Sequence, residues 1–327
     1  MQRQEDLEIK LEELRLAVES GLSELVRDRS PGGLYDSVRY VLSGGGKRLR
    51  PLLLLLSADV FEADLQEASP LALAVELAHN FSLVHDDIMD HADTRRGRKT
   101  VHVLWDPDTA ILCGDVLLAL ANESVSKASS DKSAQLIQVF SEAIRGLCEG
   151  QALDMAIETK QDLKTSDYLQ MIDGKTGALL SGSLEMGGIF GGADSHARLA
   201  LRAAGKSIGR AFQIQDDLLD VVADSQHWGK VQGGDLIEGK RTYLLLKACE
   251  RATGEDLAFF EGIRPGSGLD KQEIPKARER MEELGVFDAA RASVRAYTCA
   301  ALAQIDLLPG DTSRLHALID RMAARAH

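Results

Sequence analysis

The sequence has few prolines and few aromatic residues, and it carries no excess of positive charge. Its 327 residues include seven prolines, and aromatic side chains make up 5% of the chain. The formal net charge of −13 argues against a nucleic-acid-binding surface and against a broad surface for anionic membranes. An anionic ligand would therefore need a local cluster of basic side chains or a bound metal.

Cysteine is also scarce, and its spacing excludes two common uses of this residue. The sequence contains four cysteines: Cys113, Cys148, Cys249 and Cys299. They form no C-x-x-C pair, which argues against a zinc site and against a disulfide framework. We expect all four to be small buried apolar residues in a reducing compartment.

Long hydrophobic runs are missing as well. The purest apolar run, Leu52 to Leu56, is far too short to cross a bilayer. The N-terminal residues MQRQEDLEIK are charged and lack the apolar core of a signal peptide. We therefore expect a cytoplasmic protein with no stable membrane insertion.

Helical periodicity is abundant. Apolar residues recur at i, i+3 and i+4 in four long segments, which are residues 7–26, 71–90, 134–157 and 198–222. Short breaks rich in glycine or proline fall at residues 30–33, 44–46, 191–192 and 233–234. None of these breaks is long enough for an inter-domain linker. The pattern predicts a single all-α domain over residues 1–327, a bundle of roughly ten or more helices.

One acidic pattern occurs twice, as DDIMD at 86–90 and DDLLD at 216–220. On a helix the first and fifth aspartates share a face, where like charges cost about 0.2–0.5 kcal/mol per pair. Both patterns lie among apolar residues, so a merely solvated face is a poor explanation. A divalent cation would relieve the repulsion, and oxygen ligands without a Cys or His triad favour Mg²⁺ over zinc. A di-iron bundle would need Glu-x-x-His motifs instead.

Basic residues follow glycines at three places. Residues 44–50 read GGGKRLR, which departs from a P-loop because Arg48 stands where that motif has Ser or Thr. Further basic groups follow each acidic pattern, in RRGRK at 95–99 and in GKVQGGDLIEGKR at 229–241. Glycine turns that lead into Lys and Arg can bind phosphate groups. Arg48, Arg98 and Lys99 could equally be solvated.

In combination these motifs resemble the trans-isoprenyl diphosphate synthases, a family of polyprenyl synthetases. The matching segments are GGGKRLRP (44–51), ELAHNFSLVHDDIMDHADTRRGRKTVH (76–102), GQALD (150–154), GKTGALL (174–180), FQIQDDLLDV (212–221) and GKVQGGDLIEGKRT (229–242). They form a motif core over residues 44–242. The resemblance implies an isoprenoid synthase-like helical fold around a central cavity.

The resemblance also implies a role for each matching residue. The Mg²⁺ ligands and their supports would be Asp86, Asp87, Asp90, Asp216, Asp217 and Asp220. The allylic diphosphate would contact Arg95, Lys175, Lys230 and Lys240. Isopentenyl diphosphate would contact Lys47, Arg50, His79 and Arg96. Thr176 and Gln213 would lie near the reacting carbons.

The implied reaction is a prenyl transfer. Isopentenyl diphosphate would condense with dimethylallyl, geranyl or farnesyl diphosphate after ionisation of the allylic C–O bond. Roughly three Mg²⁺ ions per active site and the basic side chains would stabilise the leaving diphosphate. The family resemblance also implies a homodimer.

Product length depends on the residues before Asp86. In the resembling family the growing chain runs beside this helix, and Phe81 lies about 7–8 Å, more than one turn, from Asp86. In similar family members, one aromatic residue at the place of Phe81, here beside the small Ser82, goes with C15 or C20 products. DDIMD without a two-residue insertion favours geranylgeranyl diphosphate (C20), with farnesyl (C15) or longer products as alternatives. A class I terpene cyclase or a regulatory synthase subunit would fit the two aspartate motifs and GGGKRLR less well.

Overall fold

The structure, a computed structural model, describes residues 2–128, 131–160, 162–222 and 232–324. It is almost entirely helical, which confirms the all-α prediction. The chain divides into two compact units of discontinuous segments. The first unit comprises Met1–Ile144, Gly182–Arg202 and Leu308–Leu315, and the second comprises Arg145–Ser181, Ala203–Leu307 and His316–His327. The single domain around a central cavity stays a prediction.

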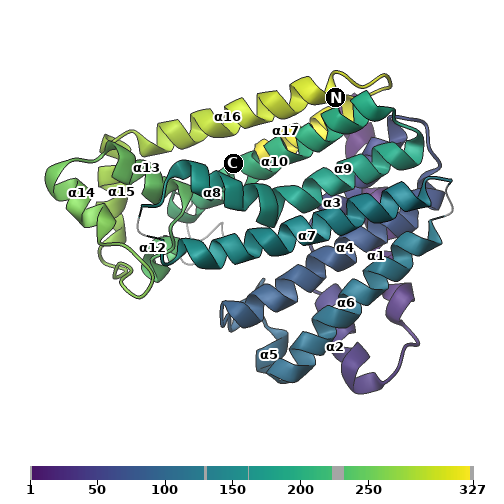
Figure 1. The fold of residues 1–327 in the computed structure, drawn as a ribbon, viewed down its shortest axis with the longest axis horizontal. Helices are drawn as coiled ribbons and strands as arrows, with labels where there is room; N and C mark the ends of the chain where they lie inside the picture. The colour runs from purple at the N-terminus through teal and green to yellow at the C-terminus, as the bar shows by residue number, and fades with distance from the viewer. Residues whose placement is uncertain (1, 129–130, 161, 223–231, 325–327) are drawn as a thin grey trace. The chain divides into compact units, whose positions relative to one another are not determined.

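The helices and strands follow one another as drawn in Figure 1. The first part of the chain forms α1 (Gln2–Val26), α2 (Gly32–Leu42), α3 (Leu49–Asp59), α4 (Leu65–Met89), β1 (Thr94–Arg95), β2 (Arg98–Lys99), α5 (Val101–Leu104) and α6 (Pro107–Lys127). The middle part forms α7 (Ser133–Ile157), α8 (Thr165–Ile172), η1 (Asp173–Gly177), α9 (Ala178–Gly191) and α10 (Ser195–Val222). The last part forms α12 (Gly234–Glu238), α13 (Tyr243–Arg251), α14 (Gly254–Glu261), α15 (Ile274–Glu283), α16 (Val286–Ile305) and α17 (Ser313–Ala323).

All four long helices that periodicity predicts are present, as α1, α4, α7 and α10. The predicted breaks also coincide with helix ends, since α2 begins at Gly32 and α9 ends at Gly191. Two features escaped the sequence pattern. They are the two-residue strands β1 and β2, which pair antiparallel, and the single π-turn η1.

In the first unit, α4 packs along α6 and α3, and α4 and α6 run side by side in Figure 1. Asp64 caps α4 by accepting a hydrogen bond of 2.7 Å from the Gln66 backbone N–H, a contact that stabilises the helix start. The apolar run Leu52–Leu56 is entirely buried in α3. Because a Cβ on Gly187 would lie 2.1 Å from the Leu54 carbonyl oxygen, only glycine allows this approach of α9 to α3.

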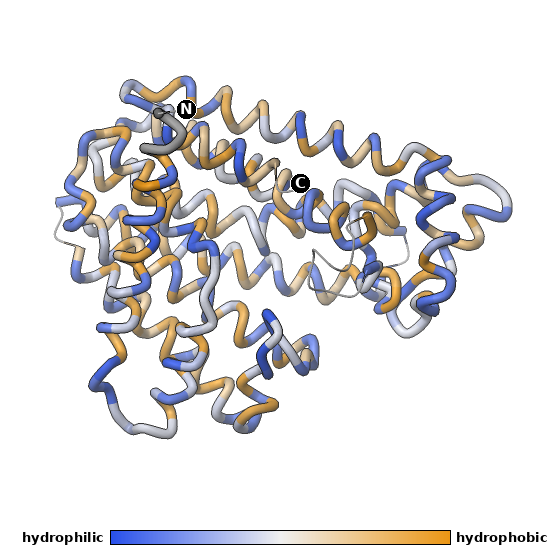
Figure 2. Tube along the Cα trace, turned by 180° about the vertical axis from the view of Figure 1, so that it is seen from behind, coloured by the Kyte–Doolittle hydropathy of each residue, from blue (hydrophilic) through white to orange (hydrophobic). Residues whose placement is uncertain are grey.

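In the second unit, α8, α10, α13 and α16 contribute to one apolar core that includes Tyr168, Ile214, Leu218 and Phe287. Figure 2 shows hydrophobic and hydrophilic residues alternating along the long helices, as amphipathic packing requires. Ten of the buried residues of this core lie beyond residue 250, where the sequence offered no motif. Their observed contribution is therefore packing.

The cysteine prediction is partly wrong. Cys113 is buried, but Cys249 is only half-buried, and Cys148 and Cys299 are exposed on α7 and α16. Both exposed cysteines lie on the outer faces of amphipathic helices, where a small residue is tolerated without burial. Burial raises the pKa of the Cys113 thiol to about 11, which keeps that thiol protonated near neutral pH.

Within the described residues, α6 is the one helix that is long and apolar enough to span a membrane by length and composition. Its Leu117 and Leu120 are buried, and the helix packs against α4. Such packing is typical of a core helix. Its outer face carries exposed Ile111 and Leu112.

Candidate active site

The first aspartate motif, residues 86–90, lies at the C-terminal end of α4. The Asp90 backbone N–H donates to the Asp86 carbonyl oxygen at 2.8 Å, so Asp86 and Asp90 lie one turn apart on the same face. Asp86 is half-buried, and Asp90 caps the helix end and is exposed. Two carboxylates one turn apart at the rim of a helix suit a hydrated cation.

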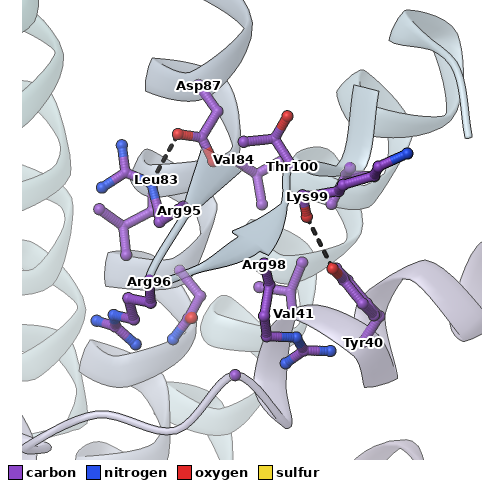
Figure 3. Close-up of a pocket in the computed structure, with 13 residues that line it drawn as sticks. Tyr40, Val41, Leu83, Val84, Asp87, Arg95, Arg96, Arg98, Lys99 and Thr100 are labelled. Atoms are coloured by element: carbon purple, nitrogen blue, oxygen red, sulfur yellow. Dashed lines mark hydrogen bonds and ion pairs between the residues drawn. The ribbon is translucent and has the colours of Figure 1, made fainter. Parts of the chain in front are cut away.

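Asp87 has different surroundings from its two neighbours. It is 5% exposed, and its Oδ1 accepts a hydrogen bond of 2.6 Å from Arg95 Nε, drawn as a dashed line in Figure 3. Burial raises the pKa of Asp87, although Arg95 acts in the opposite direction. The metal role predicted for Asp87 stays a prediction; in the structure this carboxylate accepts a hydrogen bond from Arg95.

Arg95 and Arg96 lie on the short hairpin of β1 and β2, and α2 holds that hairpin in place. Figure 3 shows Tyr40 of α2 reaching the second strand, where its hydroxyl donates to the Lys99 carbonyl oxygen at 2.8 Å. The Arg98 guanidinium carbon lies 3.9 Å from the centre of the Tyr40 ring, in cation–π geometry. Tyr40 thus holds β2, the strand that follows Arg95 and Arg96, the two arginines predicted to bind substrate.

The glycine-rich segment at 44–50 forms the loop before α3, and a buried ion pair anchors it. Arg48 Nη1 donates to Glu76 Oε1 at 2.6 Å, and both residues are less than 5% exposed. Asn80 Nδ2 donates to the same Glu76 oxygen at 3.2 Å. The alternative of a solvated Arg48 is therefore wrong, because its guanidinium pairs with a buried carboxylate 28 residues further along the chain.

Arg96 contacts the same loop, and His79 lies close to Arg50 and Arg96. Arg96 Nη1 donates to the Gly45 carbonyl oxygen, and a Cβ on Gly46 would lie 2.9 Å from the same nitrogen. Burial, followed by the charges of Arg50 and Arg96, holds the pKa of His79 well below its usual range. His79 is thus a neutral imidazole near Arg50 and Arg96, and exposed Lys47 lies on the same loop. These are the four residues predicted to bind isopentenyl diphosphate.

The lowered pKa of His79 has a consequence for stability. The unfolded chain binds a proton at His79 near the ordinary pKa of about 6.5, and the folded protein resists it. Stability contributed by this site is therefore present above pH 6.5 and is lost as pH falls from there toward the lowered pKa. We expect the melting temperature of the wild type to fall more steeply between pH 7 and 5 than that of His79→Gln, as measured by calorimetry. Equal slopes in the two proteins would contradict this.

Phe81 and Ser82, the predicted chain-length residues, are both buried on α4. The Phe81 ring meets the His85 ring edge-on with centroids 4.9 Å apart. On α6, a Cβ at Gly114 would lie 2.1 Å from His85 Nε2, so Gly114 is needed to admit the imidazole. The edge-on pair of rings limits the space on this side of Asp86.

In the second unit, the π-turn η1 presents Lys175. Its Nζ donates to Asp154 Oδ2 of α7 at 2.5 Å. A Cβ on Gly150 would lie 1.9 Å from the Lys175 backbone nitrogen, so the backbones of α7 and η1 approach through glycine. A π-turn also inserts an extra residue into a helix, which turns Lys175 toward Asp154 and is a frequent feature of functional sites.

A chain of polar contacts links Thr176, Gln213 and Asp217. The Thr176 hydroxyl donates to Gln213 Oε1 at 3.4 Å, and Gln213 Nε2 donates to Asp217 Oδ1 at 3.1 Å. Asp217 also accepts from the Tyr168 hydroxyl at 2.6 Å and from the Tyr243 backbone N–H at 3.0 Å. Burial raises the pKa of Asp217 to about 7. Like Asp87, this second aspartate of its motif is engaged by protein donors.

Of the other two aspartates, Asp220 is buried and accepts from the Asp235 backbone N–H at 3.0 Å. Asp216 is half-buried. Lys240 is exposed and lies 2.7 Å from the Glu238 carboxylate. Lys230, predicted to contact the allylic diphosphate, lies outside the described residues. The geometry thus distinguishes Asp216 from Asp217 and Asp220 as the accessible carboxylate of its motif.

Several residues that shape the site were missed by the motif search. Tyr40, Glu76 and Tyr168 each bond a predicted site residue or its loop. Glu76 belongs to the matched segment 76–102, and a glutamate on the apolar face of a helix was the available signal. Tyr40 and Tyr168 carried none, because single aromatic residues in amphipathic helices usually belong to the core.

A magnesium ion fits the aspartates of the two motifs that are half-buried or exposed, which are Asp86, Asp90 and Asp216. Within the described residues, no three His, Cys, Asp or Glu side chains form a ready cage for a metal. Mg²⁺ does not need such a cage, because it keeps several waters and takes one or two carboxylates plus substrate phosphates. The pair Asp86 and Asp90 meets that requirement, as does the single carboxylate of Asp216.

Comparison with known proteins decides the family. The polyprenyl synthetase family profile matches residues 32–281. The chain belongs to the polyprenyl synthetase family. Its prenyl diphosphate synthase relatives make it a prenyltransferase.

Among curated polyprenyl synthetases, the geranylgeranyl diphosphate synthase of Methanosarcina mazei is 38% identical over 293 residues, 89% of either chain. The geranylfarnesyl diphosphate synthase of Natronomonas pharaonis is 36% identical over 341 aligned positions, covering 98% of each. The crystal structure of geranylgeranyl pyrophosphate synthetase from Pyrococcus horikoshii Ot3 superimposes with a TM-score of 0.91 at 35% identity, with 99% of both chains covered.

Proposed function

We propose that this polyprenyl synthetase condenses isopentenyl diphosphate with an allylic diphosphate to give geranylgeranyl diphosphate. The observation that carries the proposal is that both aspartate motifs are complete and similarly built. In each motif the second aspartate is buried and accepts a hydrogen bond from the protein, Asp87 from Arg95 and Asp217 from Tyr168. The first aspartate of each motif is half-buried. A regulatory subunit would have no reason to keep both motifs intact.

The metal ligands in this proposal are Asp86, Asp90 and Asp216, supported by Asp87, Asp217 and Asp220. Bound Mg²⁺ supplies charge that neutralises the diphosphate leaving group. Arg95, Lys175 and Lys240 add cationic donors to the same group, with Lys230 from the undescribed segment. Donors arranged before reaction stabilise developing charge without reorganisation.

In the proposed reaction, uncharged side-chain oxygens stabilise the allylic cation, and the released diphosphate acts as the base. As the allylic C–O bond breaks, the carbonyl oxygen of Gln213 and the hydroxyl oxygen of Thr176 are suited to stabilise the cation. The isopentenyl double bond attacks that cation, with its own diphosphate held by Lys47, Arg50 and Arg96. Proton loss completes the reaction, and the released diphosphate is our proposed acceptor. Neutral His79 adds a polar contact without adding another positive charge.

A C20 product is favoured by Phe81 and by the names of similar enzymes. The Phe81 ring, before Asp86 on α4, packs edge-on against His85, which lies against Gly114 of α6. A geranylgeranyl diphosphate synthase and a geranylfarnesyl diphosphate synthase are both among the relatives. The second candidate product is therefore longer than C20, and a C15 product is the third.

We propose that the enzyme acts as a cytoplasmic homodimer. The exposed apolar residues Leu104, Ile111 and Leu112 form a surface on α5 and α6 that a second copy would cover. Sedimentation equilibrium should give twice the monomer mass at micromolar concentration. Ile111→Asp should shift that mass toward the monomer, and a wild-type monomer would contradict this part.

Incubation with substrates tests the proposed function directly. Purified protein receives isopentenyl diphosphate, Mg²⁺ and dimethylallyl, geranyl or farnesyl diphosphate in turn, and the products are sized after dephosphorylation. We expect geranylgeraniol from each primer. Hydrocarbon products would indicate a cyclase, and activity only after addition of a second chain would indicate a regulatory subunit.

The hairpin clamp gives a smaller, separate prediction. Tyr40→Phe removes the hydrogen bond to Lys99 but keeps the ring under Arg98, whereas Tyr40→Ala removes both contacts. A net hydrogen bond contributes about 0.5–1.5 kcal/mol, so we expect Tyr40→Phe to raise KM for the diphosphate substrates by roughly two- to tenfold. Tyr40→Ala should raise KM further, with kcat changed less in both variants. Steady-state kinetics measures the split, and a fall in kcat alone would contradict a positioning role.

A further inference from the structure

A cleft of about 390 Å³ lies in the first unit, between α1, α2 and the loop that leads into α3. Its volume falls within the range of small-molecule sites. Leu22, Val26 and Leu42 give it an apolar floor. None of the residues assigned to either diphosphate lines it among the described part of the chain, so it is distinct from the candidate active site.

The rim of the cleft is predominantly basic. Arg27, Arg39 and Arg48 line it together with one carboxylate, Glu19. Each arginine also pairs with an acid that does not line the cleft: Arg27 with Glu24, Arg39 with Asp36 at 2.8 Å and Arg48 with Glu76 at 2.6 Å. Arg39 Nη1 donates to the backbone carbonyl oxygen of Val26, a residue of the floor, at 2.8 Å. A surface that combines three guanidinium groups with aliphatic side chains suits an amphipathic anion.

Arg48 supplies the observation that points to a ligand. Two of its nitrogens are occupied, since Nη1 donates to Glu76 and Nη2 donates to the Leu42 carbonyl oxygen at 3.0 Å. Its Nε is buried without a hydrogen-bond partner, and the nearest carboxylate oxygen, on Glu19, is 3.8 Å away. Arg48 and Glu19 both line the cleft, so the Nε that lies 3.8 Å from Glu19 is at its wall. Buried charged donors are rarely left without an acceptor, which a bound anion would provide.

We propose that this cleft binds a small amphipathic anion, a phosphate-type head group on a short hydrocarbon chain, as a second site outside the active site. The head group accepts from Arg48 Nε and meets Arg27 and Arg39. The hydrocarbon lies on Leu22, Val26 and Leu42. Short prenyl phosphates have this chemistry, and free inorganic phosphate shares only the head group.

Occupancy of the cleft is coupled to the proposed isopentenyl diphosphate site through the glycine loop, and this part rests on the proposed function. Gly45 and Arg48 line the cleft, and Lys47 lies between them. An anion on Arg48 places negative charge beside the loop that must attract a diphosphate. The two ligands therefore oppose each other, each weakening the other by the same factor.

Calorimetric titration with n-hexyl phosphate, in the absence of Mg²⁺, tests the site. Each methylene that the floor buries contributes roughly fourfold in affinity, so hexyl phosphate should bind at least roughly tenfold more tightly than inorganic phosphate. Arg27→Gln should weaken this binding up to roughly fivefold, the scale of an exposed ion pair. Ser23→Trp, which places an indole at the cleft rim, should abolish it, and Lys10→Gln on the same helix should change nothing. Equal binding by wild type and Ser23→Trp, or by the two phosphates, would overturn the site.

Kinetics tests the coupling separately. Hexyl phosphate should raise KM for isopentenyl diphosphate in the wild type and lose that effect in Ser23→Trp, which should keep wild-type activity without the ligand. An unchanged KM despite measured binding would overturn the coupling. Binding with the predicted variant pattern in a protein that makes no prenyl diphosphate would instead refute the proposed function and leave the cleft standing.

Discussion

Asp86→Asn is expected to lower kcat about 10³-fold, with little change in folding. The substitution keeps the shape of a half-buried side chain at the end of α4 but removes the charge that Mg²⁺ requires. Loss of one group aimed at developing transition-state charge typically costs about 10²–10³ in rate, and a lost metal ligand belongs at the upper end. Asp216→Asn on α10 should have a comparable effect. Single-turnover product formation measures both.

Asp93→Asn is the matched control for these variants. Asp93 is exposed, lies three residues beyond Asp90, and offers only its backbone oxygen to Thr100. It makes the same charge change without touching the proposed ligands. Asp93→Asn should retain activity within about threefold, the range expected for an exposed charge. Asp86→Asn with activity as high as that of Asp93→Asn would contradict the metal role of the first motif.

Phe81→Ala is expected to change the product from C20 to C25 and longer. The Phe81 ring is 8% exposed and packs edge-on against His85, whose imidazole lies against Gly114 of α6. Its removal opens volume one turn before Asp86, where the growing chain would otherwise stop. Size analysis of the dephosphorylated products, with primer and isopentenyl diphosphate at fixed ratio, measures the shift.

A buried Phe→Ala change costs about 3–5 kcal/mol, so a milder variant accompanies it. Phe81→Leu should move part of the product beyond C20 with a smaller loss of stability. Phe140→Leu, at a fully buried phenylalanine of α7 in the same unit, controls for nonspecific loosening of the core. Unchanged product length in both Phe81 variants, or equal lengthening in Phe140→Leu, would refute the role of Phe81.

The sequence was sufficient for the helices but not for the irregular backbone. Periodic apolar residues predicted α1 and α4, because the burial of one helix face is encoded in the local sequence. Glycine pairs marked the start of α2 and the end of α9. The hairpin of Arg95 and Lys99 has only two residues per strand, too few to show an alternating pattern. The π-turn at Lys175 depends on the close approach of Gly150, which comes from a different helix.

The same limit applies to the site. The clusters of aspartate and arginine in the sequence were enough to locate the motifs. Whether an aspartate faces a cation or a protein donor depends on partners distant in sequence. Asp217 meets Tyr168, and Arg48 meets Glu76, through tertiary packing that no spacing rule contains. The sequence therefore indicates candidate site residues, but it does not indicate which atom each one touches.

The central claim is that Asp86 and Asp216 hold divalent ions around one diphosphate. A crystal structure of the enzyme with Mg²⁺ and an unreactive thiolo analogue of an allylic diphosphate tests it most directly. We predict both carboxylates about 2.0–2.1 Å from Mg²⁺ ions that contact the same diphosphate. Carboxylates that face separate solvent regions, or that hold ions on different anions, would contradict the account.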